Sequence, residues 1–528
     1  MREFSPQGLP SRIYGTRRQA VGRPVIIGAL ALLLSGCAAR ASAPAATPAT
    51  RAVDPAQQLQ ADLNDIFNAP AVDHTQWGVT FYSVRQNRTL YSLNSSRFLI
   101  PASNQKILIT AAAAERLGWD FRFTTRLVGT APISADGTLN GDLIVTGNGD
   151  PTINTRDAER WRVFDTWAAS LKAKGLKSIS GRLVGDDNAF AEPGWGVGWA
   201  WDNLQYGYGA PATALQFNEN QVELLIGPGM HQGAHAIIAL SPAGSGMVIR
   251  NRVSTAPPGT ETSIDIDRIP GEPYLTVRGQ IAVGAPQTAT FASVDDPTRF
   301  YLNGLRSALE RYGITVGLGV ADGDELPTPP STDGNAIELV VDHSPPLVDI
   351  VDVALKWSRN IYAETVLLSM AEPGAPASGT RGLRSVATTL QQWGVTPESY
   401  LPRDGSGLSR YDYVSADTLT QVLRHLLSDE RHSAPFQSCL PVAGVSGTLA
   451  GRMKGTPAEG RVRAKTGTLS NVRALSGYLT TLDGDTVVFS IMANNFRVSA
   501  GTIDDLMDGA VNRVVQFTSP TATRSDRR

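Results

Sequence analysis

The chain has 528 residues, of which 42% are hydrophobic and 18% charged, and its formal net charge of -2 accompanies a pI near 6.3. This composition excludes a disordered or fibrous protein and is enough for roughly two to four globular domains. It also provides no concentrated basic surface, so we expect no nucleic-acid partner.

The N-terminus has the pattern of an export signal. Arg12, Arg17, Arg18 and Arg23 precede an apolar run over residues 25–34, which is shorter than the roughly 20 residues that span a bilayer. Leu34-Ser35-Gly36-Cys37 then resembles a bacterial lipobox, in which Cys37 would be lipidated and become the first mature residue. A plain signal peptide cleaved nearby is the alternative. We therefore expect residues 1–37 to be a signal peptide and the protein to reach the periplasm or cell envelope, attached to a membrane through Cys37.

Residues 38–55 are rich in Ala, Pro and Thr, which is typical of an extended linker, and folded structure is expected from about residue 55. Cys439 is the only other cysteine, and we expect it to be a small buried apolar residue. His231 and His235 lie in a Gly-rich stretch without the glutamate that zinc peptidases place between such histidines. We expect no metal and no cofactor.

Apolar periodicity predicts the main elements along the chain. Helical spacing is found over residues 55–67, 296–312, 347–356, 361–371, 383–393, 416–427 and 503–515. Strand patterns occupy residues 77–84, 474–482 and 486–494, and shorter ones recur between residues 138 and 283. The last two long strands flank Asp483-Gly484-Asp485, which predicts a hairpin. Residues 518–528 are expected to be a disordered tail.

Three short motifs follow one another along the chain and point to one chemistry. They are Ser103-Asn104-Gln105-Lys106, Ser358-Arg359-Asn360 and Lys465-Thr466-Gly467. Each alone arises by chance, and Ser103 alone would be a helix-capping serine. Together, in this order, they are the signature of an active-site serine that acylates as penicillin-binding enzymes do.

The residue types fit distinct roles in acyl transfer. Ser103 is the expected nucleophile, and Lys106, one helical turn later, can take its proton as a neutral amine. Burial and the nearby cation Lys465 would both lower the pKa of Lys106. Ser358 can relay a proton to the leaving amine, and Asn360 can orient Lys106 and hold a substrate amide.

Residues 465–468 are expected to form an edge strand beside the cleft. Because Gly467 has no side chain, a peptide can lie against this strand, and Lys465, Thr466 and Thr468 suit a terminal carboxylate. The backbone N–H groups of Ser103 and Thr468 are the expected oxyanion hole.

The separation between the first two motifs leaves roughly 200 residues more than a compact acyl-serine domain needs. We therefore predict a discontinuous catalytic domain over residues 56–120 and 343–517, interrupted by β-rich accessory domains over residues 121–342.

The motifs and their flanks resemble the class C low-molecular-mass penicillin-binding proteins, the D-alanyl-D-alanine carboxypeptidase/endopeptidase family. Further stretches carry the resemblance: Gly149-Asp150-Pro151-Thr152, residues 404–409 and residues 444–449. It implies an α/β (α+β) fold, with a β-lactamase/transpeptidase-like core of antiparallel sheet flanked by helices. The implied activity is that of a serine D,D-peptidase that removes terminal D-Ala from peptidoglycan stem peptides or cleaves their cross-bridges. β-Lactams would acylate Ser103.

The resemblance also implies a contact between an acid of the insertion and the amino end of diaminopimelate. Trp201-Asp202-Asn203 matches the relevant stretch, and Asp202 is the candidate. The family often has two acids here, whereas this chain has Asn203 in the second place. Leu469 can line the same pocket or be a core leucine.

Three other functions remain as alternatives. A β-lactamase would need a positioned base to hydrolyse the acyl-enzyme quickly, and no dedicated Glu-containing loop is evident. An esterase on the same fold would not explain the insertion. A non-catalytic peptidoglycan-binding protein would not need all three motifs intact.

Overall fold

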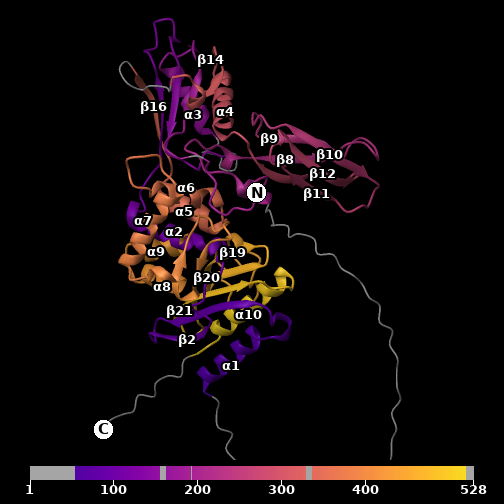
Figure 1. Ribbon diagram of the computed structural model, residues 1–528, viewed down its shortest axis with the longest axis vertical. Helices are drawn as coiled ribbons and strands as arrows, with labels where there is room; N and C mark the ends of the chain where they lie inside the picture. The colour runs from indigo at the N-terminus through magenta and orange to yellow at the C-terminus, as the bar shows by residue number, and fades with distance from the viewer. Residues whose placement is uncertain (1–53, 155–161, 192, 329–335, 519–528) are drawn as a thin grey trace, which may run out of the picture.

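The computed structural model describes residues 54–154, 162–191, 193–328 and 336–518 (Figure 1). The expected export signal, Cys37, nearly all of the 38–55 linker and residues 519–528 lie outside these ranges. Within them, no helix combines the length and apolar character needed to cross a membrane.

The core is a five-stranded antiparallel sheet whose strands come from the two ends of the described chain. Its order is β19-β20-β21-β1-β2. The bounds are β19 (Val462–Leu469), β20 (Val472–Thr480), β21 (Thr486–Asn494), β1 (Gln76–Ser83) and β2 (Arg88–Leu93). The three long strands predicted from the sequence are confirmed as β1, β20 and β21. Their sequence patterns are strong because apolar residues lie on both faces of the sheet.

The two faces of this sheet are covered by different helices, and side chains alternate between them. Leu475 and Leu479 pack towards α1 (Pro55–Phe67) and α10 (Ala500–Val515). Ala474 and Tyr478 pack on the opposite side. The helices there are α2 (Gln105–Leu117), α5 (Leu347–Lys356), α6 (Asn360–Ser369), α7 (Gly379–Gln392), α8 (Ala416–Ser428) and α9 (Ser433–Ser438).

Cys439 lies in this helical core and is fully buried, as predicted, with Sγ 3.4 Å from the carbonyl oxygen of Val348.

The segment between β2 and the later helices builds separate sheets beside and above the core (Figure 1). One is a mixed five-stranded sheet, in the order β15 (Val320–Asp322), β7 (Leu183–Asp186), β5 (Leu143–Gly147), β3 (Thr124–Gly129), β16 (Ile337–His343). The helices α3 (Val163–Ala173) and α4 (Pro297–Arg311) pack together beside it. Helix α3 was not predicted.

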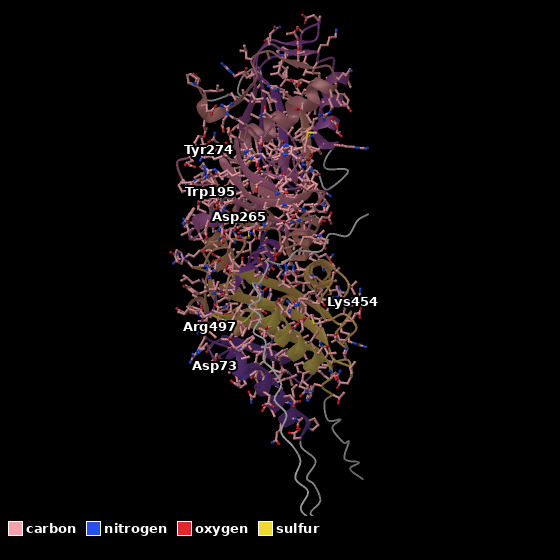
Figure 2. The ribbon with its side chains drawn as sticks, turned by 90° about the vertical axis from the view of Figure 1, so that its right-hand side faces the viewer. Asp73, Trp195, Asp265, Tyr274, Lys454 and Arg497 are labelled. Atoms are coloured by element: carbon pink, nitrogen blue, oxygen red, sulfur yellow. The ribbon has the colours of Figure 1, made fainter. Side chains whose placement is uncertain are left out.

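Three smaller sheets complete the inserted part. They are β13 (Thr288–Ser293), β8 (Gln221–Gly227), β9 (Ile237–Ser241); β10 (Ile249–Ala256), β12 (Leu275–Ala282), β11 (Ser263–Asp267); and β14 (Thr315–Val316), β6 (Ser178–Ile179), β4 (Thr138–Leu139). Seen from the side, Asp265 of β11 and Tyr274, which directly precedes β12, lie above the core, and Asp73 lies near its lower end (Figure 2).

Candidate active site

Ser103 lies in a short 3-10 turn, η2 (Ala102–Asn104), which leads directly into α2. Ala102 has a φ of 46°, a left-handed conformation that costs a non-glycine residue roughly 1–3 kcal/mol and is often found at functional sites. The buried amide of Asn104 lies 2.6 Å from Ser476 Oγ on β20. The turn is therefore fixed between helix α2 and strand β20, and Ser103 itself is half-buried.

Lys106 is fully buried one turn after Ser103. Its Nζ lies 3.0 Å from Ser103 Oγ, 2.8 Å from Asn360 Oδ1 and 2.7 Å from the carbonyl oxygen of Ser406. Burial lowers the pKa of Lys106 to about 8, while the buried carboxylates of Asp404, Glu364 and Asp412 act in the opposite direction. We expected burial and Lys465 to lower this pKa; burial does so, whereas the leading charge effects are those of carboxylates, which raise it.

The second motif brings Ser358 and Asn360 to different lysines, Ser358 to Lys465 and Asn360 to Lys106. Helix α5 ends at Lys356, and Ser358 has a φ of 58°, a conformation that turns the chain sharply before α6 begins at Asn360. Ser358 Oγ accepts a hydrogen bond from Lys465 Nζ at 2.8 Å. Asn360 is thus the first residue of α6, and its side chain starts from the N-terminus of that helix.

Lys465 lies on β19, which is an edge strand as predicted. It is fully buried, and its Nζ donates to Ser358 Oγ and to the carbonyl oxygen of Thr466, each at 2.8 Å. Burial first, and then the charge of Lys106, lower the pKa of Lys465 well below its usual range. Lys106 and Lys465 therefore share a buried site, in which desolvation and mutual repulsion disfavour the state with both amines protonated.

Further along β19, Thr466 is half-buried with Oγ1 2.7 Å from Thr448 Oγ1, and Thr468 is exposed. Leu469 is half-buried at the end of the strand. Thr466 and Thr468 are therefore both accessible to solvent on the strand that carries Lys465.

Gly467 allows the strand to approach the Ser103 turn. A Cβ at this position would lie 2.7 Å from the Pro101 carbonyl oxygen and 2.9 Å from Ala474 Cβ, closer than real Cβ atoms come to such neighbours. The absence of a side chain at Gly467 thus allows η2 to pack against β19. From the sequence we had instead expected this glycine to leave space for a bound peptide.

The inserted part reaches the site through the segment that contains Asp202. Asn360 Nδ2 donates to the carbonyl oxygen of Tyr208 at 2.8 Å, and Tyr208 Oη donates to Asn203 Oδ1 at 3.1 Å. Asp202 is exposed in the short helix η4 (Trp201–Asn203), and burial together with the Asp202 charge raises the pKa of Tyr208 to about 12. The segment that carries Asp202 is therefore adjacent to the second motif.

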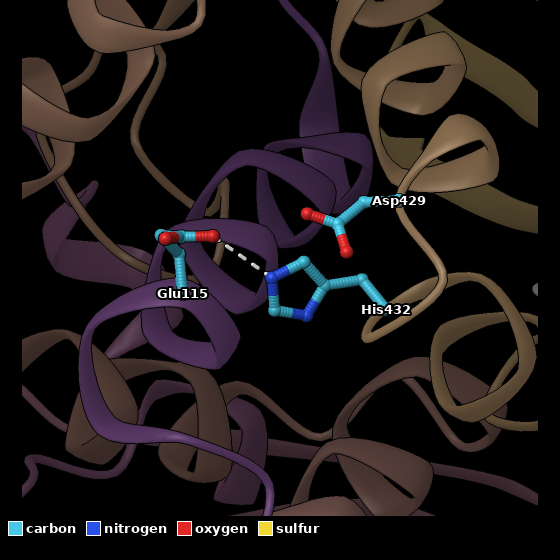
Figure 3. A group of neighbouring side chains, drawn as sticks. All are labelled: Glu115, Asp429 and His432. Atoms are coloured by element: carbon cyan, nitrogen blue, oxygen red, sulfur yellow. Dashed lines mark hydrogen bonds and ion pairs between the residues drawn. The ribbon is translucent and has the colours of Figure 1, made fainter.

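Two groups of side chains among the described residues could offer ligands to a metal ion. In one, His432 Nε2 lies 2.9 Å from Glu115 Oε2, with Asp429 beside them (Figure 3). Arg431 donates to both carboxylates and compensates their charge. Glu115 lies near the far end of α2, about 18 Å along the helix direction from Ser103. The other group, Asp187, Asp322 and Asp324, belongs to the inserted part.

The sequence model that represents the D-Ala-D-Ala carboxypeptidase 3 (S13) family matches residues 59–515 of this chain. The chain belongs to this family. A D-alanyl-D-alanine carboxypeptidase from Actinomadura sp. (strain R39) is 33% identical over 516 residues, which cover 94% of this chain and 90% of that protein.

Two solved structures of penicillin binding protein 4 (dacB) from Haemophilus influenzae are similar to this S13 peptidase. The first has a TM-score of 0.75 at 26% identity, and covers 86% of this chain and 99% of its own. The second, complexed with a novel β-lactam, has a TM-score of 0.69 at 25% identity with the same coverage. The predicted family, fold class and activity are confirmed. The protein is a serine D,D-peptidase of peptidoglycan, and its α/β fold is similar to that of penicillin binding protein 4.

Sequence reasoning missed three contributors to the site. The carbonyl oxygens of Ser406 and Tyr208 hold Lys106 and Asn360, and the hydroxyl of Thr448 contacts Thr466. Ser406 and Thr448 lie in stretches that carried the family resemblance, which was the available signal. Tyr208 lies six residues after Asp202, outside the stretch Trp201-Asp202-Asn203 that was compared with the diaminopimelate contact.

Proposed function

We propose that this S13 peptidase acts through an acyl-enzyme on Ser103, with Lys106 as the general base. The observation that carries the proposal is the set of three partners around Lys106 Nζ. A neutral amine has two N–H groups and one lone pair. Asn360 Oδ1 and the Ser406 carbonyl oxygen can only accept hydrogen bonds, so each accepts one from an N–H group of the amine. The lone pair is then left to accept the proton of the Ser103 hydroxyl.

The remaining residues support the steps that follow. Ser103 Oγ attacks the carbonyl carbon of the penultimate D-Ala, and the N–H groups of Ser103 and Thr468 stabilise the oxyanion, at typically about 3–4 kcal/mol per donor. The bond to the leaving amine then breaks, and Ser358, hydrogen-bonded to Lys465, passes a proton to that amine. Water hydrolyses the ester and frees Ser103.

For the substrate, we assign the terminal carboxylate to Lys465 and the hydroxyls of Thr466 and Thr468. Asp202 contacts the amino end of diaminopimelate, and Leu469 lines that pocket. The exposure of Asp202, with its position beside the Tyr208 segment, supports this assignment. The same attack serves a terminal D-Ala and a D,D cross-bridge, because the bond broken is of the same kind.

The protein binds β-lactams as well as peptidoglycan, and a β-lactam acylates Ser103 by the same route. The β-lactam complex of penicillin binding protein 4 supports this step. A lactam leaving group stays tethered in the site, so the adduct persists.

We place the protein in the periplasm or cell envelope, exported by residues 1–37 and held by a lipid on Cys37. The arginines before the apolar run and the lipobox-like Leu34-Ser35-Gly36-Cys37 support this location. Labelled fatty acid incorporated by the full chain, and lost in Cys37→Ala, is the expected result. Equal labelling of the wild-type protein and Cys37→Ala would overturn the proposal of a lipid anchor on Cys37.

The acyl-enzyme is tested by intact mass after benzylpenicillin treatment of the soluble part from residue 54. Ser103→Ala is compared with Ser428→Ala, an exposed serine on α8. We expect a stable adduct on the wild type and on Ser428→Ala, and none on Ser103→Ala. Rapid turnover without an adduct would indicate a β-lactamase, and no reaction would indicate a protein that only binds peptidoglycan.

A further inference from the structure

The loop over residues 404–409 touches the catalytic lysine but belongs to none of the three motifs. The carbonyl oxygen of Ser406 accepts a hydrogen bond from Lys106 Nζ at 2.7 Å. Gly407, with a φ of 80°, lies so close to the Ser103 turn that a Cβ would come within 1.9 Å of the Ala102 carbonyl oxygen. Small movements of this loop therefore move an acceptor that fixes the amine.

The side chain of Asp404 holds this loop in shape. Its carboxylate is buried and accepts from the backbone N–H groups of Gly407 and Ser409, each at 2.7 Å, and from the Ser406 hydroxyl at 3.3 Å. The fourth donor is the indole Nε1 of Trp199, at 2.7 Å from Oδ2. Both oxygens thus have hydrogen-bond donors, as a buried polar group requires.

Two more buried acids pack near Asp404, and their environments favour the neutral form. Glu364 accepts from the N–H groups of Gly405 and Ser406, and burial followed by the charge of Asp404 raises the pKa of Glu364 to about 8. Burial and Asp404 also raise the pKa of Asp412 well above its usual range, and its Oδ2 has no partner in the described part of the chain. Glu364 and Asp404 therefore both accept hydrogen bonds from the backbone of the loop beside Lys106.

The fourth donor comes from a different part of the molecule. Trp199 belongs to the inserted segment, and two other contacts fix that segment on the loop: Ser409 Oγ donates to the Val197 carbonyl oxygen at 2.7 Å, and Gly198 packs on the ring of Tyr411. The inserted part therefore contributes a hydrogen bond to the acid that shapes the loop beside Lys106.

We propose that Asp404 is a positioning residue for Lys106, and that the Trp199 indole makes this positioning depend on the docking of the inserted part. Without the carboxylate, the N–H groups of Gly407 and Ser409 lose their acceptor, and the loop relaxes. The Ser406 carbonyl then leaves Lys106 Nζ, and the lone pair of the amine is no longer held towards Ser103. The proposal rests on the acyl-enzyme mechanism given above.

The test measures the acylation rate constant with benzylpenicillin between pH 6 and pH 9.5. Trp199→Phe removes only the indole donor. Trp167→Phe is its control, since Trp167 is buried in the inserted part and its Nε1 has no partner among the described residues. We expect the plateau rate to fall about tenfold in Trp199→Phe with an unchanged pH midpoint, and to stay at the wild-type value in Trp167→Phe.

Asp404→Asn provides the second measurement. The charged and titratable groups around Lys106 are Lys465, Asp404, Glu364 and Asp412. Removing the Asp404 charge destabilises the ammonium form of Lys106, so the rising limb of the pH profile moves to lower pH, while the plateau falls at least as much as in Trp199→Phe. A residue that only stabilised the fold would leave the pH midpoint in place.

Each outcome decides the proposal. Wild-type rates in Trp199→Phe, or a fall matched by Trp167→Phe, would overturn the role of the inserted part. A folded Asp404→Asn with a wild-type plateau and midpoint would overturn the role of Asp404; if this variant fails to fold, Trp199→Phe alone decides. No adduct on the wild-type protein would overturn the proposed function as well, whereas an adduct on wild type with unchanged variants would overturn this inference alone.

Discussion

Asn360 offers the sharpest single perturbation of the site, because it joins Lys106, the proposed base, to the inserted part. Its Oδ1 accepts from Lys106 Nζ and its Nδ2 donates to the Tyr208 carbonyl oxygen, both at 2.8 Å. Asn360→Ala removes one of the two acceptors that aim the Lys106 lone pair. Leaving a buried donor without its acceptor costs about 1–3 kcal/mol, so acylation is expected to slow by about 5- to 150-fold.

The assay is stopped-flow acylation by a chromogenic β-lactam, with thermal unfolding of each variant as the control for folding. Asn360→Asp is the matched variant, since it keeps an acceptor for Lys106 but places a carboxylate beside it. This charge raises the pKa of Lys106, so acylation is expected to be slow at pH 7 and to recover as the pH rises. An Asn360→Ala rate within about threefold of wild type, in a folded protein, would refute the role of this residue in orienting the base.

Three further outcomes follow from the structure. Wild-type acylation is expected to rise with pH, to reach half its plateau near pH 8 and to level off above about pH 9, because burial lowers the pKa of Lys106 to about 8 and only the neutral amine accepts the Ser103 proton; a rate that is flat from pH 6 to 9 would contradict this. Gly467→Ala places a Cβ 2.7 Å from the Pro101 carbonyl oxygen, so we expect a loss of about 1–3 kcal/mol of stability in thermal unfolding together with slower acylation, and an unchanged melting temperature would count against the packing argument. Burial raises the pKa of Cys439 to about 12, so a thiol reagent at pH 8 should modify it only on unfolding, and fast labelling of the native protein would show that the residue is accessible.

Much of the core could be predicted because its apolar patterns are local and strong. The limits of α1, α5 and β21 match the predicted ranges residue for residue, since each has a buried face and a clear boundary, such as Asp54 and Pro55 at the start of α1. Helix α3 was missed although Val163, Phe164, Trp167 and Leu171 have helical spacing. The surrounding Gly- and Pro-punctuated strands led us to treat the whole region as β-type.

The structure brings the side chains of the three motifs together as expected, but the atoms that position them could not be predicted. Ser406 and Tyr208 act through backbone carbonyls, and every residue has a carbonyl, so no side-chain pattern reveals them. The reason for Gly467 also needed coordinates, because Pro101 becomes its neighbour only when β19 packs on η2. Roles that depend on long-range backbone placement are not encoded in any short window of sequence.

The position of β1 in the core sheet constrains the order in which the chain can fold. This strand pairs with β21, and Ser83 donates to Asp485, a residue 402 positions later. At about 5–20 residues per second, β1 waits about 20–80 s during synthesis before β21 exists, with only β2 beside it. The buried side chains of Trp77, Val79 and Phe81 have an incomplete sheet to pack in during that time. Residues 76–93 are therefore most exposed to aggregation before the C-terminal hairpin completes the sheet.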